Sequence, residues 1–291
     1  QSVDDYSGAM ITLDQDTGFP QVATVRDKDP QTIVDEWKEM YPGHSKDGQH
    51  PKRVHCDNGG EFQGVFQEHV RDSGARLTRS LPDVPRTNAK QERFHGTCEK
   101  GVRASMSAAG APLAFWSYAL RHWIYNYQRV PDRKEPTDET TPYERQHGRA
   151  STSPLVPFGC KCIYYKAGTE KFEGHGIEGI VLQPAQLGAY VVMNFKEYKE
   201  SRGNVELTTT RDVKIHPAEF PWRTMQEEFP NYTNWAFDVR SGGVTDLDWR
   251  VDSKGRGRCT KPGCGKLILS EQEVPITCRA CLRNEEHPRG R

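Results

Sequence analysis

An acidic residue stands between a short strand-like run and two glycines in the stretch Cys56-Asp57-Asn58-Gly59-Gly60-Glu61-Phe62. Residues 53–56 are predicted to form the strand, so Asp57 falls at its carboxyl end, where ligands gather in α/β sheets. The glycines would let the backbone approach a ligand or a phosphate closely. The stretch therefore predicts a binding loop at the edge of an α/β sheet.

Strands and helices are expected on both sides of this loop. Residues 10–13 and 21–25 are predicted to be strands joined by a turn at 16–18, which puts Asp14 at the end of the first strand. Helical spacing of apolar residues follows after Pro30 and again from Phe62 to Val70, and a short strand is expected around Leu77. The order strand, strand, helix, strand, helix predicts an α/β fold.

A further helix is predicted from Glu92 to Met106, because apolar residues recur there at every fourth position. Glu92 lies on the opposite face, which it shares with cations. Residues 113–127 are rich in aromatic side chains and are expected to form a core helix, and the polar run 132–141 is expected to be a loop.

The pattern changes after Leu155, where short strand-like runs are separated by glycine and proline. Such runs are typical of a small barrel or sandwich. We therefore expect four regions: an α/β core with trailing helices (1–150), a small β-barrel or SH3-like domain (151–216), a linker of unassigned structure (217–250) and a cysteine module (251–291).

Overall composition limits the classes of partner. The 291 residues carry 40 basic and 40 acidic side chains, so net charge gives no general support to a nucleic-acid or membrane partner. No apolar run is long enough for a membrane span or a signal peptide, and the mean hydropathy is −0.83. We expect an intracellular, unanchored protein, and because the chain starts at Gln1 we expect it to be part of something longer.

Four of the eight cysteines have the spacing of a zinc site. Cys259, Cys264, Cys278 and Cys281 form a C-x4-C-x13-C-x2-C series, which in an intracellular protein favours structural zinc over disulfides. Free or oxidised thiols are the alternative. The remaining cysteines lack ligand spacing and are expected to be small buried apolar residues: Cys56, Cys98, Cys160 and Cys162.

Three carboxylates are candidates for one divalent-metal site. Asp14 ends a strand, Asp57 follows another, and Glu92 opens a helix that could close the site. Carboxylate oxygens are preferred ligands of Mg²⁺, and phosphoryl transfer between DNA strands uses two such ions. Taken singly, each aspartate is more often a turn or cap residue, so the hypothesis depends on the combination.

The motifs that contain these carboxylates are similar to those of a known family. Residues from about 10 to 162 resemble the integrase core of copia-type long-terminal-repeat retrotransposons, a relative of retroviral integrase. The stretch 13–19 resembles the first-strand signature, 56–62 matches the second, and 88–93 resembles the third. Asp57 and Glu92 are 35 positions apart, as in the family. Downstream segments also resemble it: Phe115-Trp116, 125–131, Thr141-Pro142-Tyr143-Glu144 and Phe158-Gly159-Cys160.

This resemblance implies a ribonuclease-H-like fold, a mixed sheet flanked by helices. It also implies metal-dependent processing of DNA 3′ ends and their direct transfer to target DNA. Asp14 and Asp57 would bind one Mg²⁺ or Mn²⁺ ion, and Asp14 with Glu92 the other. The expected partners are element ends, target DNA and further copies of the chain when it is active, with no membrane or small-molecule substrate. The expected location is the nucleus or a cytoplasmic virus-like particle, not secretion.

Some choices stay open. Asp4, Asp5 and Asp16 are rivals for the first carboxylate, and Asp14 is preferred because apolar strand residues precede it. The family usually has other residues where Ala89, His95 and Gly96 stand, which concerns DNA contacts more than metal binding. A catalytically decayed or domesticated DNA-binding protein of the same fold is therefore one alternative. Another ribonuclease-H-like transposase or nuclease is the second.

The region around Glu92 is locally positive, with seven basic and three acidic residues from Arg76 to Arg103. Side chains near the expected site could position DNA through its phosphates without reading sequence. A solvated helix face is the alternative for each of them. The candidate DNA contacts are Lys90, Arg93, His95, Lys100 and Arg103.

Overall fold

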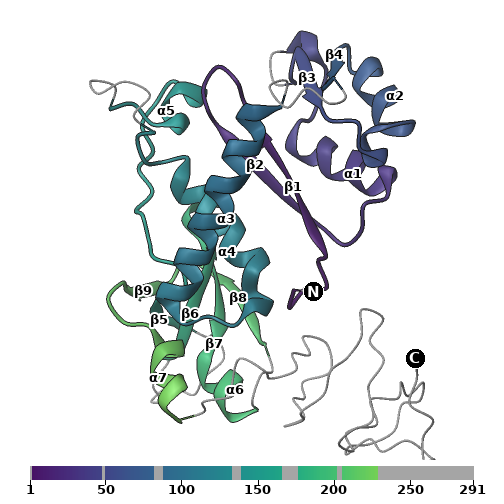
Figure 1. Cartoon of the computed structure of the whole chain (residues 1–291). Coiled ribbons are helices and arrows are strands. Elements are labelled where there is room, and N and C mark those ends of the chain that lie inside the picture. Colours follow the sequence, from purple (N-terminus) through teal and green to yellow (C-terminus); the bar gives the residue numbers. More distant parts are fainter. Residues whose placement is uncertain are drawn as a thin grey trace, which may run out of the picture.

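The computed structural model describes residues 2–47, 50–81, 88–132, 139–165, 176–201 and 205–228. The four cysteines predicted to bind zinc, and most of the region 217–250, lie outside these residues. Figure 1 shows a mixed α/β molecule in which two long helices separate an N-terminal α/β part from a strand-rich part. No helix in the described ranges is both long and apolar enough to cross a bilayer.

The chain begins with the predicted hairpin. β1 (Gly8–Leu13) and β2 (Pro20–Val25) pair antiparallel, from Gly8 opposite Val25 to Leu13 opposite Pro20. The turn closes through the Asp14 amide, which donates to the Phe19 carbonyl at 2.9 Å. Gly18 has a φ of 72°, a value that glycine adopts without strain. We call residues 14–19 the hairpin tip.

A second strand pair follows the first α-helix, and a second α-helix connects its two strands. β3 (Arg53–Cys56) and β4 (Arg76–Arg79) are parallel, and α1 (Pro30–Met40) and α2 (Val65–Asp72) precede and connect them. α1 begins where the Asp29 carboxylate accepts a hydrogen bond from the Gln31 amide, with proline at its first position. One apolar cluster joins all these elements: Met10, Ala23, Val25, Ile33, Val34, Trp37, Val54, Phe66, Val70 and Ala75.

The strand pairing differs from the expected single mixed sheet. Within the described ranges, β1 pairs only with β2 and β3 only with β4, giving two separate two-stranded sheets. Side-chain packing on α1 and α2 holds the pairs together instead of a continuous ladder of backbone hydrogen bonds. Asp14 and Asp57 were expected at the ends of neighbouring strands of one sheet. Instead, β1 and β3, which precede them, belong to two separate sheets.

Two long helices cross the middle of the molecule (Figure 1). α3 (Ala89–Ala109) ends at Gly110, which has the left-handed conformation of a helix cap, and α4 (Trp116–Tyr127) follows. They pack closely at Gly101, where an added Cβ would lie 2.0 Å from the Trp123 indole nitrogen. Both predicted helices are thus present: α3 is longer at both ends than predicted, and α4 begins after the turn Leu113–Phe115.

The strand-rich part is one antiparallel sheet in the order β8-β7-β6-β5-β9. Its strands are β5 (Lys161–Tyr165), β6 (Gly176–Pro184), β7 (Tyr190–Asn194), β8 (Leu207–Thr210) and β9 (Val213–His216). Two short helices accompany it, α6 (Phe195–Glu200) and α7 (Pro221–Glu228), while α5 (Pro142–His147) lies beside the turn between β1 and β2 (Figure 1). Single 3-10 turns occur at Ser45–Asp47, Gly60–Phe62, Leu113–Phe115 and Gln186–Gly188.

The sheet and the long helices share one core. Trp222 of α7 is fully buried and packs on Phe115 and Phe158, with ring centroids 5.0 and 6.0 Å away. The cluster also contains residues of α3, α4, β6 and β7: Met106, Ala109, Tyr118, Ala119, Ile180, Leu182 and Met193. Strands thus occur where short strand-like runs were predicted, and in the described residues they form one open sheet, with β8 and β9 at its edges, packed onto the helices of the preceding region.

Candidate active site

Asp14 is held in the hairpin tip through one of its two carboxylate oxygens. Oδ1 accepts hydrogen bonds from the amides of Asp16 and Thr17 at 2.9 and 2.8 Å, and from the Thr17 hydroxyl at 3.0 Å. In the described part of the chain, no hydrogen bond reaches Oδ2. Asp14 is exposed, so it acts as a turn cap with one oxygen and presents the other to solvent.

The first turn of α3 is attached to the same hairpin. The Lys90 ammonium donates to the Gln15 carbonyl at 2.8 Å, and the Gln91 side-chain amide donates to the Ile11 carbonyl at 2.8 Å. These contacts span 75 and 80 residues of sequence. Because Glu92 follows directly, its turn lies against the end of β1 that carries Asp14. Glu92 itself is exposed.

Asp57 lies in a separate loop braced by Arg79. The Arg79 guanidinium donates to the carbonyls of Asp57 and Phe62 at 3.3 and 2.6 Å. Asp57 Oδ1 accepts from the Gly59 amide at 2.9 Å, and a Cβ on Gly59 would lie 3.0 Å from that oxygen and 2.6 Å from Glu61 Oε2. The carboxylates of Asp57 and Glu61 thus lie close to the Gly59 Cα, and a side chain at this position would require the flexible end of Glu61 to move. Sequence patterns did not single out Arg79 as a support of this loop.

The structure separates the rivals for the first carboxylate. Asp4 pairs with Arg121 at 3.5 Å in a mostly buried contact, and burial together with Asp4 raises the pKa of Tyr118. Asp4 and Asp5 precede the first residue of β1, whereas α3 begins beside the last residue of β1. The two ends of this six-residue strand are about 20 Å apart. Asp16 lies in the tip, where its amide supports Asp14. Of the four, Asp14 ends the strand beside the turn that carries Glu92.

The three carboxylates come from elements that lie toward one end of the molecule: the hairpin tip, the start of α3 and the β3–β4 pair (Figure 1). Contacts tie the first two together. Nevertheless, within the ranges that the structure describes, no group of three His, Cys, Asp or Glu side chains is close enough to hold a metal ion. The donor chemistry suits Mg²⁺, but the described geometry is not that of an assembled site.

The basic residues proposed to contact DNA are all exposed on α3: Lys90, Arg93, His95, Lys100 and Arg103. Lys90 is bound to the hairpin tip, and the His95 ring lies 2.9 Å from the Gln91 amide. The other three are on the solvent side of the helix. Their exposure is compatible with phosphate contacts and equally with a solvated face, so their role stays a prediction.

Cysteines in the described ranges behave as apolar residues. Cys98, Cys160 and Cys162 are buried, and burial raises the pKa of each thiol to about 12, which keeps them protonated. Cys56 is only partly buried, and desolvation raises its pKa as well. His50 is buried against Trp37, whose indole nitrogen lies 3.4 Å from its ring, so His50 is part of the core.

Sequence comparisons relate the chain to retrotransposon proteins of Arabidopsis thaliana. It is 25% identical over 178 residues to the retrovirus-related Pol polyprotein from transposon RE2, covering 59% of the chain and 11% of the polyprotein. The corresponding values for the Pol polyprotein from transposon RE1 are 30% over 112 residues, 37% and 7%. The resemblance predicted from the motifs is confirmed, although the chain spans only about a tenth of these relatives. No protein-family model matches it.

Solved structures give more distant similarities. A chain of the simian T-cell lymphotropic virus intasome in complex with PP2A regulatory subunit B56 gamma is 14% identical, with a TM-score of 0.41 and coverage of 71% of both chains. The HTLV-2 integrase catalytic core domain in complex with magnesium is 12% identical, with a TM-score of 0.38, and covers 48% of this chain and 84% of that one.

Proposed function

We propose that this chain carries the catalytic core of a retrotransposon-type DNA integrase with a ribonuclease-H-like fold, which processes DNA 3′ ends and joins them to target DNA. Its relation to Pol polyproteins supports the class. The observation that carries the proposal is the tie between α3 and the hairpin: Lys90 and Gln91 place the turn of Glu92 against the strand end at Asp14.

Each carboxylate then has a role. Asp14 and Asp57 bind one Mg²⁺ or Mn²⁺ ion, and Asp14 with Glu92 binds the second. When bound, the two ions activate the attacking oxygen and stabilise the leaving one. Asp14 Oδ2 and the exposed carboxylate of Glu92 are the oxygens offered beside the hairpin tip. Asp57 must approach them when cations and DNA bind, because the described geometry does not gather all three.

Other parts of the chain bind DNA, take part in oligomer formation and bind zinc. Lys90, Arg93, His95, Lys100 and Arg103 contact phosphates of the element ends or the target, and joining paired ends calls for a homo-oligomer. Cys259, Cys264, Cys278 and Cys281 hold a structural zinc ion that serves folding or partner binding. The protein acts in the nucleus, or in a cytoplasmic particle before integration.

DNA strand transfer on a short labelled duplex tests this proposal. The purified chain is expected to give joined products with added Mg²⁺ or Mn²⁺, to give none when the divalent ion is omitted, and to recover when it is restored. Omission is preferable to a chelator because a chelator would also remove zinc. A folded chain that binds DNA but yields no cleavage or joining with either ion would instead support a non-catalytic DNA-binding protein.

A further inference from the structure

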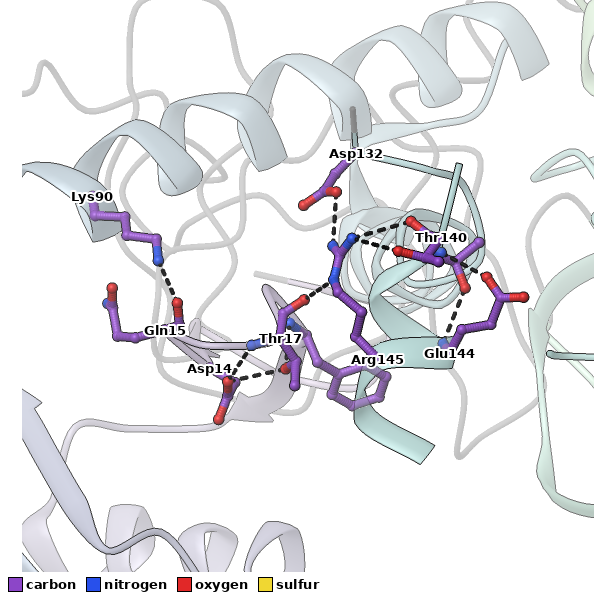
Figure 2. A network of polar contacts seen from close by, with 10 residues as sticks. Asp14, Gln15, Thr17, Lys90, Asp132, Thr140, Glu144 and Arg145 are labelled. Carbon is purple, nitrogen blue, oxygen red and sulfur yellow. Dashed lines mark hydrogen bonds and ion pairs between the residues drawn. The ribbon is translucent and has the colours of Figure 1, made fainter. Parts of the chain in front are cut away.

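Side chains of the short helix α5 are hydrogen-bonded to the hairpin tip on the side away from α3, as Figure 2 shows. Arg145 Nε donates to the Thr17 carbonyl at 2.7 Å across 128 residues of sequence. The same guanidinium donates to Asp132 Oδ1 at 2.7 Å and to the Thr140 carbonyl at 3.1 Å. All three guanidinium nitrogens are thus bonded, which fixes the orientation of this planar group.

The hydrogen bonds extend from Arg145 through Thr17 to the carboxylate of Asp14. The Thr17 hydroxyl lies 3.0 Å from Asp14 Oδ1 and 2.9 Å from the side-chain amide of Gln146. The atom of Gln146 that faces Thr17 is Oε1, so the single hydroxyl proton of Thr17 lies within donor distance of two acceptors, Asp14 Oδ1 and Gln146 Oε1. Two adjacent residues of α5 therefore support one residue of the tip, and that residue holds Asp14.

α5 is itself held firmly. Thr141 and Glu144 form a capping box, Pro142 occupies the first turn, and Gly148 caps the end in the left-handed conformation. The Arg145–Asp132 pair is largely buried, with 18% and 10% of the two side chains exposed. Such a pair orients its partners more strongly than a solvated one.

We propose that Arg145 is a positioning residue for Asp14, a role that rests on the proposed function. By fixing the Thr17 carbonyl, it fixes the Thr17 amide and hydroxyl that hold Asp14 Oδ1, and this directs Oδ2 outward toward a cation. Lys90 fixes the same tip from α3. The hairpin tip is thus bonded to both α3 and α5. These contacts hold the Asp14 carboxylate in a fixed orientation relative to the first turn of α3, which carries Glu92.

The test compares Arg145→Gln with Arg149→Gln, an exposed arginine just beyond α5. Arg145→Gln leaves Asp132 as a buried, unpaired charge, so the double variant Arg145→Gln/Asp132→Asn is made as well. We expect amide hydrogen exchange of Asp16 and Thr17 to accelerate by roughly 10- to 100-fold, and the Mn²⁺ concentration for half-maximal strand transfer to rise by a similar factor. Arg149→Gln should change neither quantity.

Two outcomes overturn the proposal. One is unchanged exchange at the tip in a folded double variant, which would mean that Arg145 does not hold the turn. The other is faster exchange with an unchanged Mn²⁺ requirement, which would reduce Arg145 to a structural role. Absence of strand transfer in the wild type would contradict the proposed function instead, and the exchange measurement would still report whether Arg145 holds the tip.

Discussion

Glu92→Gln is expected to lower the rate of DNA strand transfer on the order of a thousandfold, while the protein folds normally. Glutamine keeps the size of the side chain but removes the charge that a divalent cation needs, and loss of one such electrostatic contact in a transition state has effects of this order. Glu92 is exposed, so the free energy of unfolding should change by no more than about 0.5 kcal/mol. Strand transfer and denaturant unfolding measure the two effects.

Glu99→Gln is the matched control for this prediction. Glu99 lies two turns further along α3, is equally exposed, and loses the same charge when substituted. Its activity should stay close to that of the wild type. If both variants lost activity equally, the effect would come from the charge of the helix face, and Glu92 would have no special role.

Trp222→Ala is expected to lower the free energy of unfolding by about 3 to 5 kcal/mol, the usual cost of emptying a buried aromatic position. Trp222 is fully buried between Phe115 and Phe158, so the cavity would open where α7, the long helices and the sheet meet. Because they share one core, we expect the loss to appear in a single unfolding transition followed by circular dichroism and tryptophan fluorescence.

Trp222→Phe is the matched variant for this site. It keeps most of the apolar area, and it removes an indole N–H that is buried without a hydrogen-bond partner among the described residues. Its cost should therefore be well below that of alanine. Separate transitions for the helical and strand-rich parts in either variant would contradict a shared core.

Local signals allowed much of the fold to be predicted. The hairpin depends on a turn within residues 14–19, α1 and α3 show apolar spacing, and the segment of α4 is rich in aromatic residues, so each could be predicted from a short window. α6, which follows β7 directly, was not predicted because only short strand-like runs were expected after Leu155. The Asn194 side chain caps a helix there instead, accepting from the Glu197 amide at 3.2 Å.

Long-range contacts could not be predicted in the same way. Which strand edges pair depends on packing between segments far apart in sequence, and β1 and β3 meet through side chains on α1 and α2. Arg145 was missed as a support of the Asp14 turn because 128 residues separate it from Thr17. Arg145 directly follows the motif Thr141-Pro142-Tyr143-Glu144 in the sequence. That motif indicated the family, but it did not indicate that Arg145 contacts Thr17.

Iron-mediated cleavage of the chain tests most directly whether Asp14, Asp57 and Glu92 hold the same ions. Fe²⁺ replaces Mg²⁺ in the protein bound to a DNA end, and ascorbate with peroxide then generates radicals that cut the backbone beside the metal. We predict cuts close to all three residues, each suppressed by excess Mg²⁺. Cuts near only one of them, or cuts that persist in excess Mg²⁺, would contradict a shared metal site.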